Sequence, residues 1–249
     1  MQLLCAHHIL HEDDDLLVLS KPPGLLSQPS LDPARRYLAA EAAALLQQLH
    51  DLDEPPYLAI HHRLDRDTSG VIVLARSKRA NKPLMQAFKQ RLAKKTYLAL
   101  CSGQPRTSPH FEIENHLSPQ KRQDGGKKGP SPQVAVFSGG DYAQTSFEIL
   151  DSNASKEIHL VQANPTTGRR HQIRAHLAEA HLPILADTLY GGSTHVANTP
   201  IERVMLHAYR LEIPHPISGE VMVFDAPLPP DFEALLTHFG LSIEIDAKS

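Results

Sequence analysis

The stretch HHRLDRDTSGVIVLAR, residues 61–76, places alternating basic and acidic residues directly before an apolar run. The apolar run is rich in β-branched residues, which predicts a buried strand. In the loop before it, Asp65 lies between Arg63 and Arg66, and neighbouring cations favour the ionised form of a carboxylate. An ionised and oriented carboxylate can act as a nucleophile or as a base. The alternative is a structural ion pair, and Asp67, in the context Asp-Thr-Ser-Gly, is typical of turn capping.

Further strands and helices are predicted on both sides of this stretch, and strands outnumber helices. The predicted strands cover residues 16–22, 70–76, 95–103, 134–139, 143–150, 157–163, 210–216 and 219–227. Predicted helices begin after Asp32-Pro33, near Asn81, and near Thr166 or Thr167. Short turns join several strands, which indicates an α+β fold with a mixed, largely antiparallel sheet flanked by helices. We expect one domain over residues 1–249, with a flexible basic loop over 121–133.

The net charge of −3 conceals an uneven distribution of charge. Residues 61–106 contain eleven lysines and arginines and only two acids, whereas residues 1–60 contain three basic residues and nine acids. A basic segment in an acidic chain is typical of a polyanion-binding surface, although solvated helix positions would give the same count. Cys5 and Cys101 lack the spacing of a CxxC motif, so we expect free thiols in a cytoplasmic protein.

The segment TTGRRHQIRAH, residues 166–176, forms a second group of basic residues. On a helix, Arg170 and Arg174 lie four positions apart and share one face. Arg169 and Arg170, near the start of that helix, suit contacts with phosphate groups, while the alternative is a surface helix with solvated arginines. Tyr97, in a predicted apolar strand, is either a core residue or a ring that stacks on a base.

The sixteen histidines raise the question of a metal site. His171 and His176 are five positions apart, which is poor spacing for two ligands on one helix. The adjacent histidine pairs at 7–8 and 61–62 do not readily chelate one ion, and the sequence has no HExxH motif or Cys/His cluster. We therefore expect no metal ion and no cofactor.

Five segments, in this order along the chain, resemble the motifs of the RluA-type RNA pseudouridine synthases. They are LLVLSKPPGLLSQP (16–29), HRLDRDTSGVIVLAR (62–76), KKTYLALCSG (94–103), TGRRHQIRAHLAEAHLPILADTLYGG (167–192) and MLHAYRLEIPHPISGEVMVFDAPLP (205–229). The resemblance implies an isomerase that converts specific uridines of transfer RNA or large-subunit ribosomal RNA to pseudouridine by base flipping. It also implies a central catalytic cleft in the α+β fold, and a short form of the family, without an N-terminal RNA-binding domain.

The resemblance further implies roles for individual residues. Asp65 takes the place of the catalytic aspartate, Tyr97 that of the ring on the uracil, and Arg174 that of the cation paired with the aspartate. Arg63 matches the arginine that enters the RNA stack where the target base leaves. The other residues expected to contact RNA are Arg66, Arg169, Arg170, Lys94 and Lys95, and those expected to line the uracil pocket are Ile173 and Leu177.

The sequence departs from the family pattern at Ala186, which stands where the family usually has glycine, just before Asp187. This replacement is tolerated unless the backbone needs a positive φ. Two alternatives stay open: a non-catalytic RNA-binding module on the same scaffold, and a metal-dependent RNA hydrolase. We expect a monomer that binds RNA and does not associate with membranes.

Overall fold

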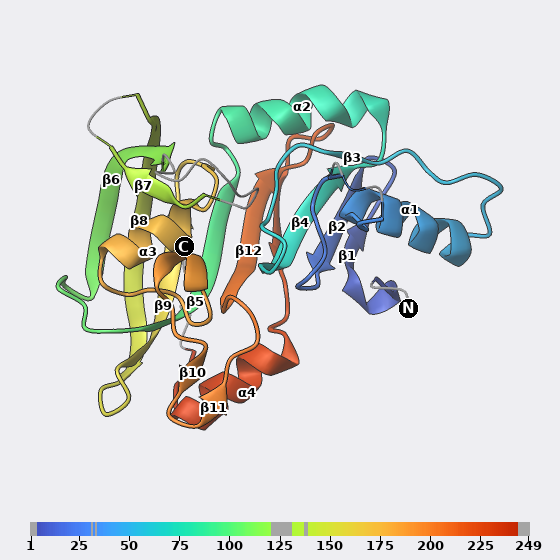
Figure 1. Cartoon of the computed structure of the whole chain (residues 1–249). Coiled ribbons are helices and arrows are strands. Elements are labelled where there is room, and N and C mark those ends of the chain that lie inside the picture. Colours follow the sequence, from blue (N-terminus) through green and yellow to red (C-terminus); the bar gives the residue numbers. More distant parts are fainter. Residues whose placement is uncertain (1–3, 31, 33, 121–130, 137–138, 244–249) are drawn as a thin grey trace. The chain divides into compact units, whose positions relative to one another are not determined.

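The computed structural model describes residues 4–30, 32, 34–120, 131–136 and 139–243 (Figure 1). The chain divides into two compact units, and each is built from two separate stretches of sequence. The first contains Met1–Tyr97 and His207–Pro230, and the second contains Leu98–Leu206 and Asp231–Ser249. The expectation of one domain over the whole chain stays a prediction. Most of the predicted basic loop lies outside the described residues.

The first unit is built around a sheet with the strand order β1-β2-β4-β12, in which β3 lies beside β4 and β13 beside β12. Its strands are β1 (Ile9–Glu12), β2 (Leu16–Lys21), β3 (Ala59–Ile60), β4 (Ser69–Ala75), β12 (Leu206–Pro214) and β13 (Val221–Asp225). Strands β4 and β12 are parallel, and the other pairs are antiparallel. This confirms the expected α+β class with a mixed, largely antiparallel sheet.

The apolar run that follows the charged loop forms β4, and all seven residues of this strand are buried. At its start, Gly70 has φ +112° and faces the backbone of β12. A Cβ atom at Gly70 would lie 2.1 Å from the carbonyl oxygen of Ala208. The glycine of the Thr-Ser-Gly sequence is therefore required by the close approach of two strands.

Two helices of this unit begin at positions that differ from the expected ones. Helix α1 (Leu38–Leu49) begins after Tyr37, because the carboxylate of Asp32 accepts a hydrogen bond from the amide of Ala34 and forms a local turn instead of a helix cap. Helix α2 (Lys78–Lys89) begins after Ser77, whose hydroxyl caps the amide of Ala80, so Pro83 lies inside the helix. Both expected helix starts were wrong.

Both helices pack their apolar faces into the core of the first unit. Figure 1 shows α1 beside the strands β1 and β2, and buried leucines of α1 belong to the same apolar cluster as those of β2. In α2 the buried residues are Ala80, Leu84 and Ala87, the spacing of one helix face. The burial of this face explains why the helix tolerates Pro83, which removes one backbone hydrogen bond from it.

The second unit contains a sheet with the strand order β5-β9-β8-β6-β7. Its strands are β5 (Lys94–Ser102, in this unit from Leu98 on), β6 (His110–Pro119), β7 (Gln133–Ala135), β8 (Asp141–Asn153) and β9 (Ile158–Pro165), and a separate pair is formed by β10 (His195–Val196) and β11 (Thr199–Pro200). Its helices are α3 (Gln172–Glu179), which packs against β8 and β9, and α4 (Pro230–Phe239). Strand β6 and helix α4 were not predicted from the sequence.

Helix α3 begins at Gln172, later than the expected start near Thr166 or Thr167. The residue before it, His171, has a left-handed backbone with φ 54°, which no helix can include. The hairpin of β12 and β13 turns at Ser218 and Gly219 as expected, with Gly219 at φ +77°. In the described ranges, no helix is both long and apolar enough to cross a membrane.

Candidate functional site

The loop that carries Asp65 is held on both sides by residues from the end of β2 and the segment that follows it. The carbonyl oxygen of Arg66 accepts hydrogen bonds from the amide of Gly24 at 2.9 Å and from Nζ of Lys21 at 3.0 Å. On the other side, the Oγ atom of Ser27 donates to the carbonyl of Leu64 at 2.7 Å and accepts from the amide of Leu64 at 3.0 Å. Asp65 therefore lies, half-buried, between two anchored neighbours.

Lys21 organises this arrangement from a fully buried position. Its ammonium group donates to three backbone carbonyls, those of Pro22, Leu25 and Arg66, each at 3.0 Å. Burial of a lysine is expensive unless its donors are satisfied, so these bonds explain why the residue is tolerated in the core. The sequence analysis did not single out Lys21, although a lysine that ends an apolar strand before Pro-Pro-Gly was a visible signal.

The two arginines beside Asp65 differ in the contacts that they form. The guanidinium of Arg66 forms two hydrogen bonds to the carboxylate of Asp67, at 2.9 and 3.1 Å, and this partner raises the pKa of Arg66. These hydrogen bonds of Arg66 go to the carboxylate that follows Asp65 in the sequence, and a role of the two arginines toward Asp65 stays a prediction. Arg63 is exposed and forms no ion pair with any described residue.

Tyr97 lies in the same compact unit as Asp65. It is half-buried in β5 and packs against the apolar core of the first unit. Burial, together with the nearby negative charge of Asp65, raises the pKa of the Tyr97 phenol. The phenol is therefore neutral at physiological pH, and Asp65 is the charged group that acts on it.

His62, two residues before Leu64, has a structural role. Its Nε2 atom accepts a hydrogen bond from the amide of Val73 in β4 at 2.9 Å, and its ring stacks on Phe88 with 4.4 Å between centroids. Burial and the nearby charge of Lys95 lower the pKa of His62 to about 3, so the ring is neutral. Burial also lowers the pKa of Lys95 to about 8.

The second group of predicted residues lies in the second unit. Arg174, in α3, binds the carboxylate of Asp187 through Nε at 2.6 Å and Nη2 at 2.7 Å. The pair is buried, with side chains 11% and 1% exposed, and the guanidinium lies over the ring of Tyr190. A pairing of Arg174 with Asp65 stays a prediction. The binding of Arg174 to Asp187 was not anticipated.

The neighbouring arginines precede α3. Arg169 donates from Nε to the carbonyl of Tyr142 at 2.8 Å, and both it and Arg170 are exposed. Because α3 begins at Gln172, the expectation that Arg170 shares a helix face with Arg174 was wrong. Both arginines nevertheless present their charge to solvent, as RNA contacts require.

The two residues expected to line a uracil pocket, Ile173 and Leu177, are buried in α3, and Leu177 has no exposed surface. A base could reach Leu177 only if neighbouring side chains moved, so this assignment stays a prediction. Lys94 is 73% exposed and lies 3.7 Å from the carboxylate of Glu212. That exposed pair is weak and leaves the ammonium available to a phosphate.

Ala186 has a left-handed backbone with φ 59°. This is the geometry in which the replacement of the usual glycine is strained, because a Cβ atom then approaches the following backbone. The amide of Ala186 donates to Ser193 at 2.7 Å, and the next residue is the Asp187 that binds Arg174. The strain lies directly beside a buried ion pair.

One group of metal-binding side chains occurs in the part of the chain that the structure describes. Donor atoms of Cys5, His7 and His8 all lie within 4.8 Å of one another. The expectation that His7 and His8 do not readily chelate one ion stays a prediction, although Cys5 adds a third donor atom beside them. The Nδ1 atom of His8 also accepts a hydrogen bond of 3.1 Å from the amide of Cys5. This bond gives the His8 ring a local structural role. Both cysteines are free thiols, as expected.

An anchored aspartate with a tyrosine beside it, in an α+β protein with exposed arginines and lysines near the same sequence segments, is typical of an enzyme that acts on nucleic acid. Residues 15–179 match the family described as RNA pseudouridylate synthase, and the chain belongs to this family. Pseudouridine synthases are isomerases, and the match confirms the resemblance seen in the sequence motifs.

Individual relatives agree with this assignment. The chain is 35% identical over 240 residues to the uncharacterized RNA pseudouridine synthase YhcT of Bacillus subtilis, covering 93% of this chain and 72% of that protein. It is 32% identical over 251 residues to the ribosomal large subunit pseudouridine synthase D of Neisseria meningitidis serogroup B, covering 98% of this chain but only 64% of that protein. The solved structure of human RNA pseudouridylate synthase domain containing 4 aligns with a TM-score of 0.74 and 28% identity, over 95% of this chain and 94% of that one.

Proposed function

We propose that this protein converts uridine to pseudouridine in RNA, with Asp65 as the catalytic carboxylate. The observation that supports this most is the anchoring of Asp65. Its neighbours Leu64 and Arg66 are each fixed by two hydrogen bonds from the segment 21–27, while its own side chain lies near Tyr97. A catalytic group must be held within a fraction of an ångström of its productive position, and this loop is built to do so.

The reaction suits a single carboxylate. It breaks the C1′–N1 bond, turns the uracil and joins C5 to C1′, after which C5 loses a proton and N1 gains one. Atoms therefore balance without a metal ion or redox cofactor. A glycosidase needs two carboxylates because it must also activate water, whereas here the base stays and water has to be kept away. Asp65 acts either by attack on C1′ or by removal of the 2′ proton.

The remaining residues take roles in binding and positioning. The target uridine leaves its stack at a cost of a few kcal/mol. Exposed Arg63 fills the gap, and Tyr97 packs on the uracil. Arg174 is proposed as the partner cation of Asp65. The exposed residues expected to contact the RNA backbone are Arg66, Arg169, Arg170, Lys94 and Lys95.

The names of several relatives favour large-subunit ribosomal RNA as the substrate, with transfer RNA as the alternative. An RNA substrate of either kind agrees with a cytoplasmic location. The monomeric state also stays a prediction.

The experiment that tests this function maps pseudouridine by carbodiimide chemistry in total RNA from cells with and without the gene. The deletion strain is then restored with the wild-type gene, Asp65→Asn or the matched control Asp67→Asn. We expect one or more sites to vanish on deletion, to return with wild type and Asp67→Asn, and to stay absent with Asp65→Asn. If Asp65→Asn restores even a few per cent of the wild-type signal, the catalytic assignment is wrong.

Two other outcomes separate the alternative functions. A non-catalytic RNA-binding module would leave every pseudouridine in place after deletion and would show no isomerisation on ribosomal or transfer RNA transcripts in vitro. A metal-dependent RNA hydrolase would cleave those transcripts and would stop when EDTA is added.

A further inference from the structure

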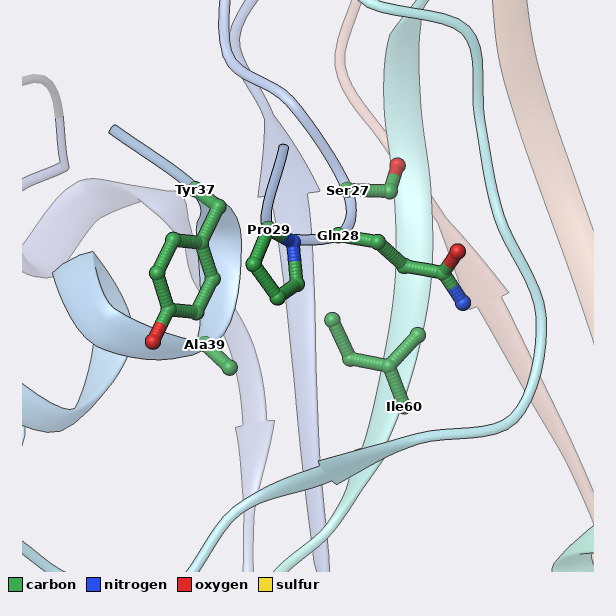
Figure 2. A pocket seen from close by; sticks show the side chains of 6 residues that line it. All are labelled: Ser27, Gln28, Pro29, Tyr37, Ala39 and Ile60. Atoms are coloured by element: carbon green, nitrogen blue, oxygen red, sulfur yellow. The ribbon is translucent and has the colours of Figure 1, made fainter. Parts of the chain in front are cut away.

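A pocket with a volume of about 390 Å³ opens beside the segment that anchors Asp65. Its lining residues are Ser27, Gln28, Pro29, Tyr37, Ala39 and Ile60, all from the first unit. Figure 2 shows the rings of Tyr37 and Pro29 next to one another, with Ile60 below them and the side chain of Gln28 running above Ile60 in this view. The volume lies in the range of small-molecule sites.

The pocket is continuous with the catalytic loop through one residue. Ser27 lines the pocket, and its hydroxyl forms both hydrogen bonds to Leu64, the residue before Asp65. Ile60, another lining residue, ends β3 and leads directly into the charged loop. A group bound in this pocket therefore contacts the same backbone segment, around Ser27, that positions the carboxylate of Asp65.

The lining chemistry suits a flat, neutral group with hydrogen-bonding edges. Tyr37, Pro29 and Ile60 supply ring and aliphatic surface, and no lining residue is charged. Gln28 is exposed, and its amide forms no hydrogen bond with any described residue, so both its donor and its acceptor are available. A phosphate would need cations that the lining does not offer, whereas a nucleobase can stack on the rings and pair with the amide.

We infer that this pocket binds an unstacked base of the RNA substrate, one that flanks the target uridine, and that Gln28 selects adenine. The inference rests on the proposed function, since the substrate is RNA. An amide can donate to one edge atom of adenine and accept from its amino group at the same time, which no other base matches as well. Tyr37 supplies the stacking surface, and base stacking on an aromatic side chain contributes about 1–3 kcal/mol.

The test uses the RNA fragment that contains the site lost on gene deletion, transcribed without modification. Each of the three nucleotides on either side of the target uridine is replaced in turn by an abasic residue, and kcat/KM is measured for each RNA. With wild-type protein we expect one flanking position to lower kcat/KM by about 10-fold to 100-fold, mainly through KM. With Tyr37→Ala or Gln28→Ala, an abasic residue at that same position should no longer lower kcat/KM.

Matched variants separate the effect of losing the Tyr37 ring from other effects of substitution. Tyr37→Phe keeps the stacking surface and should behave as wild type, and Leu52→Ala, an exposed apolar residue outside the pocket, should leave kcat/KM unchanged. Tyr37 precedes α1, so its alanine variant alone could fail through misfolding; Gln28, exposed and unbonded, provides the independent measurement. Replacement of the flanking adenine by guanine should reduce kcat/KM for wild type and have no effect for Gln28→Ala.

The outcomes distinguish this inference from the proposed function. If wild-type protein forms no pseudouridine on any RNA, the proposed function fails and the pocket loses its ligand with it. If wild type is active but neither variant changes the effect of any abasic position, the pocket inference alone is overturned. Tighter binding of an apolar peptide than of the RNA fragment, lost in Tyr37→Ala, would also overturn it and would indicate a protein partner.

Discussion

The Nζ atom of Lys21 donates a hydrogen bond of 3.0 Å to the carbonyl oxygen of Arg66, although 45 positions separate these residues in the chain. The same ammonium group binds Pro22 and Leu25, so one buried cation fixes the end of β2 and the loop after Asp65 together. Two motifs that are distant in sequence thus form a single support for the proposed catalytic carboxylate.

Replacement of Lys21 by methionine should therefore impair both stability and activity. The change removes the charged donor from three backbone carbonyls, of which that of Leu25 forms a buried bond, and loss of a buried bond of this type destabilises by about 1–3 kcal/mol. A displacement of Asp65 by about 1 Å would lower kcat by about 100-fold. Denaturant unfolding and single-turnover isomerisation measure the two effects. Lys89→Met, at an exposed position of α2, should change neither the unfolding free energy nor kcat appreciably. If Lys21→Met folds and retains the wild-type kcat, the anchor does not position Asp65.

The buried pair of Arg174 and Asp187 should behave as a unit. Loss of one partner leaves the other charge buried without its counterion, and either Arg174→Met or Asp187→Leu should lower the unfolding free energy by about 3–5 kcal/mol. The double variant should lose clearly less than the sum of the single changes, because it removes both charges of this pair. The exposed pair of Arg210 and Asp225 provides the control, and Arg210→Met should cost about 0–1 kcal/mol. Additive losses at Arg174 and Asp187 would contradict the pairing.

Much of the architecture could be predicted from local patterns. The apolar runs of β2 and β4 and the turn at Gly219 follow from hydrophobicity and turn chemistry in the sequence itself. Helix starts were less predictable, since Asp32 and Ser77 are both good cap residues and only tertiary packing decides which one is used. Strand β6 alternates exposed and half-buried positions along most of its length, which gives a weak apolar signal.

The candidate site was also predictable only in part. Asp65 and Tyr97 were predicted from motif and residue type, and they lie near each other. Partner choice could not be predicted, because Arg66 has a carboxylate on either side in sequence and only the turn geometry directs it to Asp67. The fully buried position of Lys21 was not predicted either, since lysine side chains are almost always exposed, although its place at the end of an apolar strand was a signal.

Acid should destabilise the first unit through His62. Its pKa is about 3 in the folded protein against an ordinary value of 6.5, so the unfolded chain binds a proton that the folded chain does not. The stabilisation is fully present above pH 6.5 and is lost progressively as the pH falls toward 3, by up to about 1.4 kcal/mol per pH unit.

Unfolding free energies measured across this pH range should show the slope, and His62→Gln should reduce it while it keeps an acceptor for the amide of Val73. His110→Gln, at a site where the side chain is 74% exposed, is the matched control and should leave the slope unchanged. His176, whose burial lowers its pKa to about 4, should add a second and smaller acid-sensitive contribution in the other unit. An identical slope in wild type and His62→Gln would show that His62 is not the acid-sensitive group.

Ala186→Gly should stabilise the protein, although glycine usually destabilises. At φ 59° an alanine Cβ is strained by about 1–2 kcal/mol, whereas glycine adopts this backbone freely and loses about 0.5–1 kcal/mol to its greater freedom in the unfolded chain. The net gain should be about 0.5–1 kcal/mol, or about 1–4 °C in Tm for a domain of this size. Ala44→Gly, at an exposed position inside α1, has an ordinary helical backbone and should lose about 1 kcal/mol. Opposite signs for the same chemical change would locate the strain at Ala186. A loss of stability at both positions would show that the backbone beside Asp187 accepts alanine without strain.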